Sequence, residues 1–347
     1  MTGPFPPPDI PVGRGADRPP EDRGVERDGV RLLVSTPERD DLHTFSDLVE
    51  LLRPRDVLVV NESATLAASL PARGEPGEFL LNLSTPYGPT LWVAEPRWAS
   101  DRPGPLPLRS GESIEMAGIR GTWVARFPGI PRLGFVRSEG DLGAAMRTWG
   151  TPIRYGYAAR EFPLEAYQTV FSRVPGSAEM PSAGRPFTPR LLRQLRENGV
   201  EIATIVLHAG VSSLELGDVS PGVSPVFPEP FEVPPETVAT ILRARADCGR
   251  VIAVGTTVVR AIESASVSGT LRPARGFTRV YLGPHRPVRT VDGLITGFHE
   301  ARSTHLVLLS AVVGESRLRR AYAVAAANGY LWHEFGDSHL LLVDRAA

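Results

Sequence analysis

Residues 251–264 read VIAVGTTVVRAIES, and this stretch decides the fold class. The apolar run at 251–254 is typical of a fully buried strand, and the residues after Gly255-Thr256-Thr257 follow the period of a helix. Backbone N–H groups at such a helix start, with two hydroxyls beside them, can bind an anion. Threonine is also a common helix cap, so a purely structural role for this turn is an equally good interpretation. The stretch predicts an α/β fold with a candidate ligand site where the strand meets the helix.

Polar residues also end two other predicted strands. The strand predicted at 56–61 ends at Asn61, and the strand predicted at 201–208 ends at His208. Because the carboxyl ends of strands form the ligand crevice in open α/β sheets, we expect both side chains near the glycine turn. His208 is either an acid–base or ribose contact or a partly buried structural histidine. Arg260, one helical turn beyond the glycine, is either a partner for a carboxylate or phosphate or a solvated helix residue.

The rest of the chain divides into three parts. Residues 1–29 are rich in proline and glycine, which predicts an irregular N-terminal arm. Residues 70–150 contain short apolar segments between proline and glycine turns, which predicts a small antiparallel β-barrel. Residues 30–69 and 151–347 would then form one discontinuous domain. The sequence therefore predicts a mixed α/β domain with an inserted small antiparallel β-barrel domain.

The start of the α/β domain predicts a crossover unit. Residues 31–34 are typical of a strand, residues 45–52 of a short amphipathic helix, and the buried strand at 56–61 follows. Strand, helix and strand in succession predict that the two strands run parallel.

The composition excludes several classes of protein. The chain has 347 residues, a 42% hydrophobic content and no apolar run of about 18 residues, so we expect no membrane span. Cys248 is the only cysteine, and the N-terminus has no signal-peptide pattern, so we expect a soluble, cytoplasmic, monomeric protein. A net charge of −1 argues against a strongly basic nucleic-acid protein. All 38 basic residues are arginine, which excludes a lysine Schiff base.

The stretch PSAGRPFT at 181–188 is a loop that precedes a predicted helix. Its small residues Ser182 and Gly184 would let a ligand approach the backbone. Thr188 precedes Pro189, the order that is typical of a helix cap followed by the first helical residue, so we expect its hydroxyl to be structural.

The densest polar stretch is ITGFHEARST at 295–304, which precedes an apolar helix. His299 is a candidate for proton transfer, whereas Ser303 or Thr304 either lines a ligand site or caps the helix. The spacing of the nearby histidines does not match a metal-ligand set, so we expect no metal site. Asp337, in a later Gly-Asp-Ser-His stretch, either orients a donor group or shapes a turn.

These motifs together resemble one known family. The order and spacing are similar to those of the S-adenosylmethionine:tRNA ribosyltransferase-isomerases of queuosine biosynthesis. The motifs are DVLVVNES (56–63), PSAGRPFT (181–188), VLHAG (206–210), VIAVGTTVVRAIES (251–264), DGLITGFHEARST (292–304) and FGDSHLLL (335–342).

The resemblance implies an α/β domain with an inserted β-barrel and a reaction without a metal. S-adenosylmethionine is the co-substrate, no further cofactor takes part, and tRNA is the partner. The ribosyl unit moves to 7-aminomethyl-7-deazaguanine in the tRNA, which gives epoxyqueuosine, adenine and methionine. Such a reaction needs a base, a proton donor for adenine and a site for the methionine carboxylate.

The resemblance also implies roles for the candidate residues. The donor-binding residues would be Gly255, Thr256, Thr257 and Arg260, with Ser182, Gly184 and Asn61 as further substrate contacts. His299 would act on the ribose, lined by Ser303 and Thr304. His208 and Asp337 would be acid–base or orienting groups.

Several positions depart from the family pattern and keep two alternatives open. PSAGRPF at 181–187 stands where the family has Pro-Thr-Ala-Gly-Leu-His-Phe, and Ser212 and Leu214 replace a glycine and an aromatic residue. Ala64 and Ser69 replace two arginines of the family. One alternative is a divergent paralogue with an S-adenosylmethionine-like donor and a non-tRNA acceptor. The other is a non-catalytic homologue that binds a nucleoside or nucleic acid.

Overall fold

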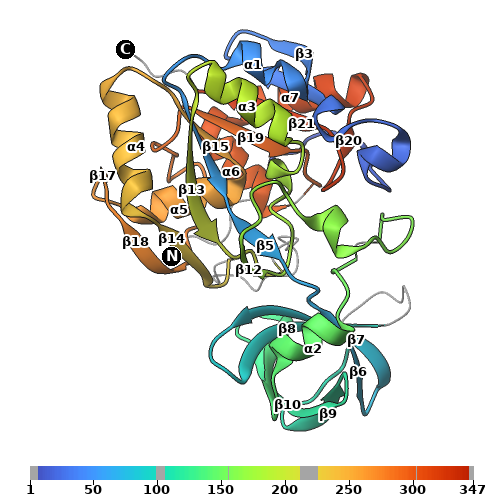
Figure 1. Ribbon diagram of the computed structural model, residues 1–347. Coiled ribbons are helices and arrows are strands. Elements are labelled where there is room, and N and C mark those ends of the chain that lie inside the picture. Colours follow the sequence, from blue (N-terminus) through green and yellow to red (C-terminus); the bar gives the residue numbers. More distant parts are fainter. Residues whose placement is uncertain (1–6, 99–105, 155, 212–225, 302, 344–347) are drawn as a thin grey trace.

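A computed structural model describes residues 7–98, 106–154, 156–211, 226–301 and 303–343. The molecule has two lobes (Figure 1). The larger lobe is an α/β domain built around one mixed sheet, and the smaller lobe is a closed β-barrel. The predicted combination of an α/β domain and an inserted antiparallel barrel is therefore confirmed.

The central sheet combines strands from both ends of the chain, so that β4 from the first part lies between strands from the later part. Its described strands lie in the order β18 (Ala274–Thr278), β14 (Glu229–Val233), β13 (Glu201–Leu207), β4 (Val57–Asn61), β15 (Val251–Val254), β19 (Gly293–Gly297), β21 (Ser338–Leu342), β2 (Arg31–Ser35) and β3 (Asp40–Thr44). Strands β13, β4, β15 and β19 run parallel to one another, so their carboxyl ends meet at one edge of the sheet. Strand β21 runs antiparallel to β19, with Ser338 opposite Gly297, so β21 begins at that same edge.

Helices cover both faces of this sheet (Figure 1). They are α1 (Leu48–Leu51), α3 (Pro189–Glu197), α4 (Pro235–Ala246), α5 (Thr256–Ala265), α6 (Thr304–Val313) and α7 (Glu315–Ala327). Successive residues of a strand point to opposite faces, and β4 follows this rule. Val57 and Val59 join the core beneath α4 to α7, whereas Leu58 and Val60 join the core beneath α1 and α3. Among the helices of the described ranges, none has the length and apolar character that a membrane crossing needs.

The turn between β15 and α5 explains why the opening stretch decides the fold. All four residues of β15 are buried, as expected for a central parallel strand that is covered on both faces. Gly255 follows with φ 98° and ψ 152°, a backbone conformation that only glycine adopts without strain. Helix α5 begins at the next residue, and its apolar side chains enter the core.

The predicted parallel crossover at the start of the domain is wrong. Strand β2 runs parallel to β21 and therefore antiparallel to β4, and three strands separate the two in the sheet. The intervening helix is a 3-10 turn at Phe45–Asp47 followed by the single turn of α1. Strand β2 instead forms a hairpin with β3, whose polar sequence DDLHT concealed it from the hydrophobic pattern.

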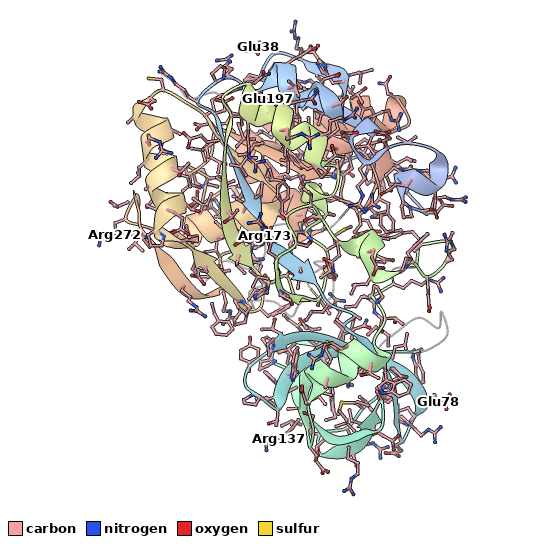
Figure 2. The ribbon with its side chains drawn as sticks, in the orientation of Figure 1. Glu38, Glu78, Arg137, Arg173, Glu197 and Arg272 are labelled. Carbon is pink, nitrogen blue, oxygen red and sulfur yellow. The ribbon has the colours of Figure 1, made fainter. Side chains whose placement is uncertain are left out.

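The barrel carries its own hydrophobic core. Its described strands are β10 (Ile119–Phe127), β11 (Ile130–Ser138), β8 (Leu91–Trp98), β7 (Gly77–Pro86), β6 (Ser69–Gly74) and β9 (Glu112–Met116). Helix α2 (Leu142–Trp149) packs against β6 and leads the chain back to the α/β domain. Glu78 and Arg137 project outward from the barrel wall (Figure 2).

Candidate active site at the carboxyl ends of the parallel strands

Asn61 joins three strand ends. Its buried amide donates to the carbonyl of Leu207 at 2.8 Å and accepts from the backbone N–H of Leu207 at 3.1 Å. The same amide donates to Thr257 Oγ1 at 3.3 Å. The predicted proximity of the ends of β4, β13 and β15 is therefore present. The hydrogen bonds of the Asn61 amide therefore position the Thr257 hydroxyl relative to the end of β13.

No side chain caps the start of α5. Gly255 occupies the cap position, and Thr256 is already the first helical residue. The alternative interpretation, that a threonine caps this helix, is therefore wrong. The loop that contains Ala183 passes close by, because a Cβ added to Gly255 would lie 3.5 Å from Ala183 Cβ. The two motifs at 181–188 and 255–257 thus lie against each other.

A small cavity of about 50 Å³ opens beside the first turn of α5, lined by Thr256, Thr257, Arg260, Thr304 and His305 among others. Arg260 donates through Nη1 to the buried carboxylate of Glu229, which also accepts from the backbone N–H of Gly210 at 2.8 Å. The second terminal nitrogen, Nη2, is buried and has no hydrogen-bond partner among the described residues. Arg260 is therefore not a solvated helix residue, and one arm of its guanidinium is available to a ligand.

A second cavity of about 140 Å³ lies next to the first. Its lining includes Ser182, His299, Ser303 and Glu334, and His305 lines both cavities. The imidazole rings of His299 and His305 stack with their centroids 4.4 Å apart. The two cavities therefore share one wall, and together they hold most of the residues that the sequence predicts.

His299 is held in a neutral form. Burial lowers the pKa of His299 well below its ordinary value, and the neighbouring His305, His333 and His339 lower it further. Its Nε2 lies 3.0 Å from Thr296 Oγ1, and its backbone N–H donates to the Tyr322 hydroxyl at 3.1 Å. A neutral imidazole has a lone pair, so it can accept a proton.

Ser303 occupies the cap position of α6, yet its side chain makes no capping bond. Its Oγ is buried and has no partner among the described residues. Thr304 is the first residue of the helix and faces the small cavity. Because a buried hydroxyl without a partner is costly, the geometry favours a ligand contact at Ser303 over a cap.

Asp337 is fully engaged by the protein. Its carboxylate accepts from the Arg31 backbone N–H at 2.9 Å, from the Arg31 guanidinium at 2.6 Å and from the Leu331 backbone N–H at 2.8 Å. It lines a narrow recess with Ser182 rather than the His299 cavity. Gly184 lines neither the recess nor these two cavities, and it packs near Phe171. The contacts of Asp337, two of which come from backbone N–H groups, favour the alternative that it shapes the turn over a role in proton transfer.

His208 faces a third and much larger cavity. Its Nδ1 lies 2.7 Å from Ser63 Oγ, which in turn lies 2.6 Å from Ser177 Oγ. Burial lowers the pKa of His208 below its ordinary value. The structure thus separates His208 from His299, although both follow parallel strands of the same sheet.

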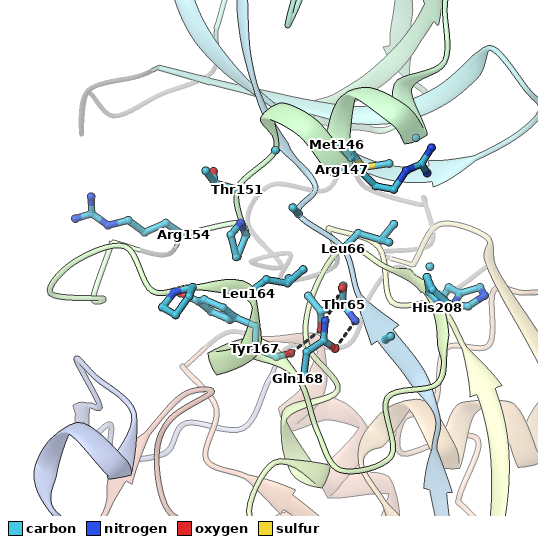
Figure 3. Close-up of a pocket in the computed structure, with 18 of the residues that line it drawn as sticks. Thr65, Leu66, Met146, Arg147, Thr151, Arg154, Leu164, Tyr167, Gln168 and His208 are labelled. Carbon is cyan, nitrogen blue, oxygen red and sulfur yellow. Dashed lines mark hydrogen bonds between the residues drawn. The ribbon is translucent and has the colours of Figure 1, made fainter.

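The cavity that His208 lines is a cleft of about 950 Å³ between the barrel and the α/β domain (Figure 3). Met146 and Arg147 of α2 form one wall, and Tyr167 and Gln168 lie opposite. Gln168 accepts from the backbone N–H of Thr65 at 3.1 Å and donates to its carbonyl at 2.8 Å, which fixes that wall.

The departures from the family pattern fall in different places. Arg185 lines the narrow recess rather than either of the two cavities, and it donates to Glu21 at 3.0 Å and to the carbonyl of Ala166 at 2.9 Å. Ala64 lines the large cleft, and Ser69 is buried where β6 meets Thr151. The positions at Ser212 and Leu214 lie outside the described residues.

Two acidic residues at this site were missed from the sequence. Glu229 is the first residue of β14 and holds Arg260, and Glu334 lines the His299 cavity. An acid inside a largely apolar segment, as in PEPFEV or YLWHEF, was the available signal for both. In the described part of the chain, no three His, Cys, Asp or Glu side chains form a metal-ligand cluster.

A family model and several curated relatives each match nearly the whole length of the chain. Residues 9–341 match a family model described as "Queuosine biosynthesis protein". The S-adenosylmethionine:tRNA ribosyltransferase-isomerase of Thermus thermophilus is 39% identical over 336 residues, which cover 93% of this chain and 97% of the relative. The protein of the same name from Moorella thermoacetica is 38% identical over 352 residues, which cover 96% of this chain and 98% of the relative.

A solved structure supports the same assignment. The crystal structure of S-adenosylmethionine tRNA ribosyltransferase from Thermotoga maritima superposes with a TM-score of 0.51 at 25% identity, covering 97% of this chain and 99% of that one. The family model, the curated relatives and this structure agree, and each spans nearly the whole chain. The chain therefore belongs to the S-adenosylmethionine:tRNA ribosyltransferase-isomerases of queuosine biosynthesis, a family of enzymes.

Proposed function

We propose that this enzyme transfers the ribosyl unit of S-adenosylmethionine to 7-aminomethyl-7-deazaguanine in tRNA and isomerises it, giving epoxyqueuosine, adenine and methionine. One observation carries the proposal. Two adjoining cavities at the carboxyl edge of the sheet gather a histidine, an arginine and several hydroxyls in a chain of this family.

The small cavity suits the methionine end of the donor. The first turn of α5 offers backbone N–H groups and the positive end of the helix, and no side chain makes a capping hydrogen bond there. Arg260 Nη2 is buried and unpartnered beside Thr256 and Thr257. A carboxylate bound there would complete the second arm of the guanidinium, because arginine binds planar anions through two parallel hydrogen bonds.

The larger of the two cavities suits the ribose. The positive sulfur of the donor acidifies the neighbouring C5′ proton, and a neutral His299 is the candidate base that removes it. Removal of this proton lets the sugar ring open as adenine leaves, and the acceptor amine then attacks C1′. Ser303 Oγ is available to hydrogen-bond a sugar hydroxyl, because it has no partner among the described residues.

The cleft between the lobes suits the acceptor. It is lined by Arg147 and Arg154, with Trp92 and Tyr167 on its walls. Arginines that pair with phosphates and aromatic rings that stack on unpaired bases are the usual means of holding a single-stranded loop of RNA. His208 lines this cleft and follows directly after Leu207, which Asn61 ties to Thr257 of the donor cavity.

A different acceptor is the second candidate. Ala64, on the wall of the cleft, stands where the family has an arginine, so one RNA-binding charge is missing from this wall. A small-molecule amine would not need that charge, whereas each phosphate contact of an RNA contributes to its affinity.

An adenine-release assay separates the two candidates. The purified enzyme is incubated with S-adenosylmethionine and either tRNA that carries the aminomethyl-deazaguanine, the same tRNA without it, or the free modified base. We expect adenine only with the modified tRNA. Adenine release with the free base at an equal or higher kcat/KM would favour the second candidate, and no adenine under any condition would overturn both.

A further inference from the structure

Glu334 is an acidic residue of the His299 cavity that the proposed mechanism does not yet use. It follows β20 (Leu331–Trp332) and lies in the turn before β21, which begins at the carboxyl edge of the parallel strands. Its side chain lines both the cavity of about 140 Å³ that contains His299 and the narrow recess beneath it.

The carboxyl group of Glu334 has a free buried oxygen. Its Oε2 is out of contact with solvent and has no hydrogen-bond partner among the described residues. Asp337, three residues later, differs because Arg31 and the Leu331 backbone engage both of its oxygens. A buried carboxylate oxygen without a partner is unfavourable, so burial favours the protonated form of Glu334. Burial accordingly raises the pKa of Glu334 to about 7.

The two neighbours of Glu334 fix its backbone. The backbone N–H of His333 donates to the carbonyl of Phe298 at 3.1 Å, and the His333 ring stacks on Tyr157 at 4.0 Å. On the other side Phe335 is buried and packs on Tyr167 at 5.3 Å between ring centroids. The hydrogen bond from His333 also ties this turn directly to the residue before His299.

Burial shifts the two pKa values in opposite directions: it raises that of Glu334 and lowers that of His299. Burial favours the neutral form of both, so below about pH 7 Glu334 holds a proton while His299 holds a free lone pair. Two titratable groups with opposite capacities in one cavity are the usual arrangement of a general acid and a general base.

We propose that Glu334 is a further catalytic residue, the acid that gives its proton to adenine as the bond between C1′ and N9 breaks. The inference rests on the proposed ribosyl transfer and adds its proton donor. The geometry of the cavity carries it: a carboxyl group with a buried, unpartnered oxygen lines the space that also contains the candidate base.

The step balances in protons and electrons. His299 takes the C5′ proton, and the electron pair of that bond forms the C5′–C4′ double bond. The C4′–O4′ bond breaks, O4′ becomes a carbonyl oxygen on C1′, and the C1′–N9 pair leaves with adenine, which receives the proton of Glu334. The resulting carboxylate then takes a proton from the acceptor amine as that amine attacks C1′. The C1′ carbonyl pair moves to O4′, which takes the proton that His299 holds.

Other titratable groups face the same space. Those that line the cavity or the recess with Glu334 are Tyr157, Glu179, His299, Glu300, His305, His333, Arg27, Arg185 and Asp337. The alkaline part of the pH profile must therefore be assigned with a variant, because the wild-type curve alone does not identify Glu334.

Glu334→Gln tests the proposal, since glutamine keeps the shape of the side chain and cannot donate the proton. We expect kcat to fall about 100-fold or more, while the Kd for S-adenosylmethionine, measured by calorimetry, changes by no more than a few-fold. The wild-type rate should decline as the pH rises above about 7, where Glu334 ionises, and this decline should disappear in the variant. The control is Glu315→Gln, an exposed glutamate at the start of α7.

A donor with a better leaving group separates an acid from a merely structural residue. An S-adenosylmethionine analogue that carries 8-azaadenine needs less protonation, so Glu334→Gln should lose much less activity with it. Equal losses with both donors, or a wild-type rate and an unchanged pH profile, would overturn the proposal. If the glutamine variant does not fold, Glu334→Asp keeps an acid and should retain part of the activity and the alkaline decline. Wild-type enzyme that releases no adenine would instead overturn the ribosyl transfer itself.

Discussion

His299 lines the cavity that we propose for the ribose, and its contacts explain why a histidine is suited there. Thr296 and His305 fix the ring, and burial keeps it neutral. We expect His299→Ala to lower kcat for adenine release by about 100-fold to 10,000-fold, because the C5′ proton loses its base. His43→Ala, on the edge strand β3, is the control. A wild-type rate in His299→Ala would remove this residue from the mechanism.

Asp28 and Glu26 both accept from Arg190, but only Asp28 is buried. Asp28 accepts from Arg190 at 3.0 Å and from the Thr188 hydroxyl at 2.7 Å, whereas Glu26 is 80% exposed and lies 3.4 Å from Arg190. We expect Asp28→Ala to lower the free energy of unfolding by about 1–3 kcal/mol, since it removes a buried acceptor together with its hydrogen bonds from Thr188 and Arg190. Glu26→Ala should change it by less than about 0.5 kcal/mol. Urea unfolding of the two variants measures the difference. Equal effects would contradict the claim that the buried Asp28 contributes more to stability than the exposed Glu26.

His339 predicts how stability depends on pH. Burial lowers its pKa to about 3, whereas an unfolded histidine titrates near about 6.5. Between these values the unfolded chain binds one proton more, so this contribution is complete above about pH 6.5 and is lost as the pH falls. We expect His339→Leu to reduce the slope of unfolding free energy against pH by about 1.4 kcal/mol per unit between roughly pH 4 and 6. Parallel slopes for wild type and variant would contradict this account.

At the residue scale, sequence patterns located His299, Thr257 and Asn61, which the structure gathers at one sheet edge. Sequence patterns did not reveal that Arg260 shares its charge with Glu229, since the two are 31 positions apart. They also missed Glu334, because an acid in an aromatic segment looks like a surface residue until its burial is known.

The strand–glycine–helix element at 251–265 depends on Gly255. Its φ of 98° with ψ of 152° lies in a region that other residues enter only at a cost of about 1–3 kcal/mol. We expect Gly255→Ala to destabilise the protein by that amount and to weaken S-adenosylmethionine binding, because the first turn of α5 would shift. Gly88→Ala is the matched control, since that glycine has open space around it. Thermal unfolding and calorimetric titration measure both effects, and a Gly255→Ala variant as stable as the control would refute the argument.

Elements with a strong pattern were predicted well, and those without one were not. The buried run of β15 and the capped start of α3, where Thr188 accepts from Leu191 N–H at 3.1 Å, both agree with the sequence. Strand β3 was missed because its five residues are mostly polar. The predicted crossover is wrong because β2 runs antiparallel to β4, with three strands between them, and the local pattern carries no information on strand order.

The two-lobed shape of the molecule creates the cleft between barrel and α/β domain (Figures 1 and 3). We expect Arg147→Ala and Arg154→Ala each to raise KM for the modified tRNA several-fold and to reduce the salt dependence of binding, because each loses a phosphate contact. KM for S-adenosylmethionine should stay unchanged. Arg137→Ala, on the outer wall of the barrel, is the control (Figure 2). Equal effects of all three substitutions would show that the cleft has no special role.

At the scale of the whole molecule, turn residues and apolar segments were enough to predict an inserted barrel, because the barrel strands are neighbours along the chain and are separated by turns rich in glycine and proline. The cleft was not predictable in the same way. Its walls combine α2, the connection that contains Tyr167 and the end of β13, and only the tertiary fold brings them together.

An isotope-tracing measurement tests the central claim, that this enzyme transfers ribose rather than a methyl group. Modified tRNA is incubated with S-adenosylmethionine labelled with carbon-13 either in its ribose or in its methyl group, and the digested nucleosides are analysed by mass spectrometry. The account predicts that the product nucleoside carries all five labelled ribose carbons from the first donor and no label from the second. Label from the methyl-labelled donor in the product nucleoside would contradict it. So would an aminomethyl-deazaguanine nucleoside that stays unchanged with both donors.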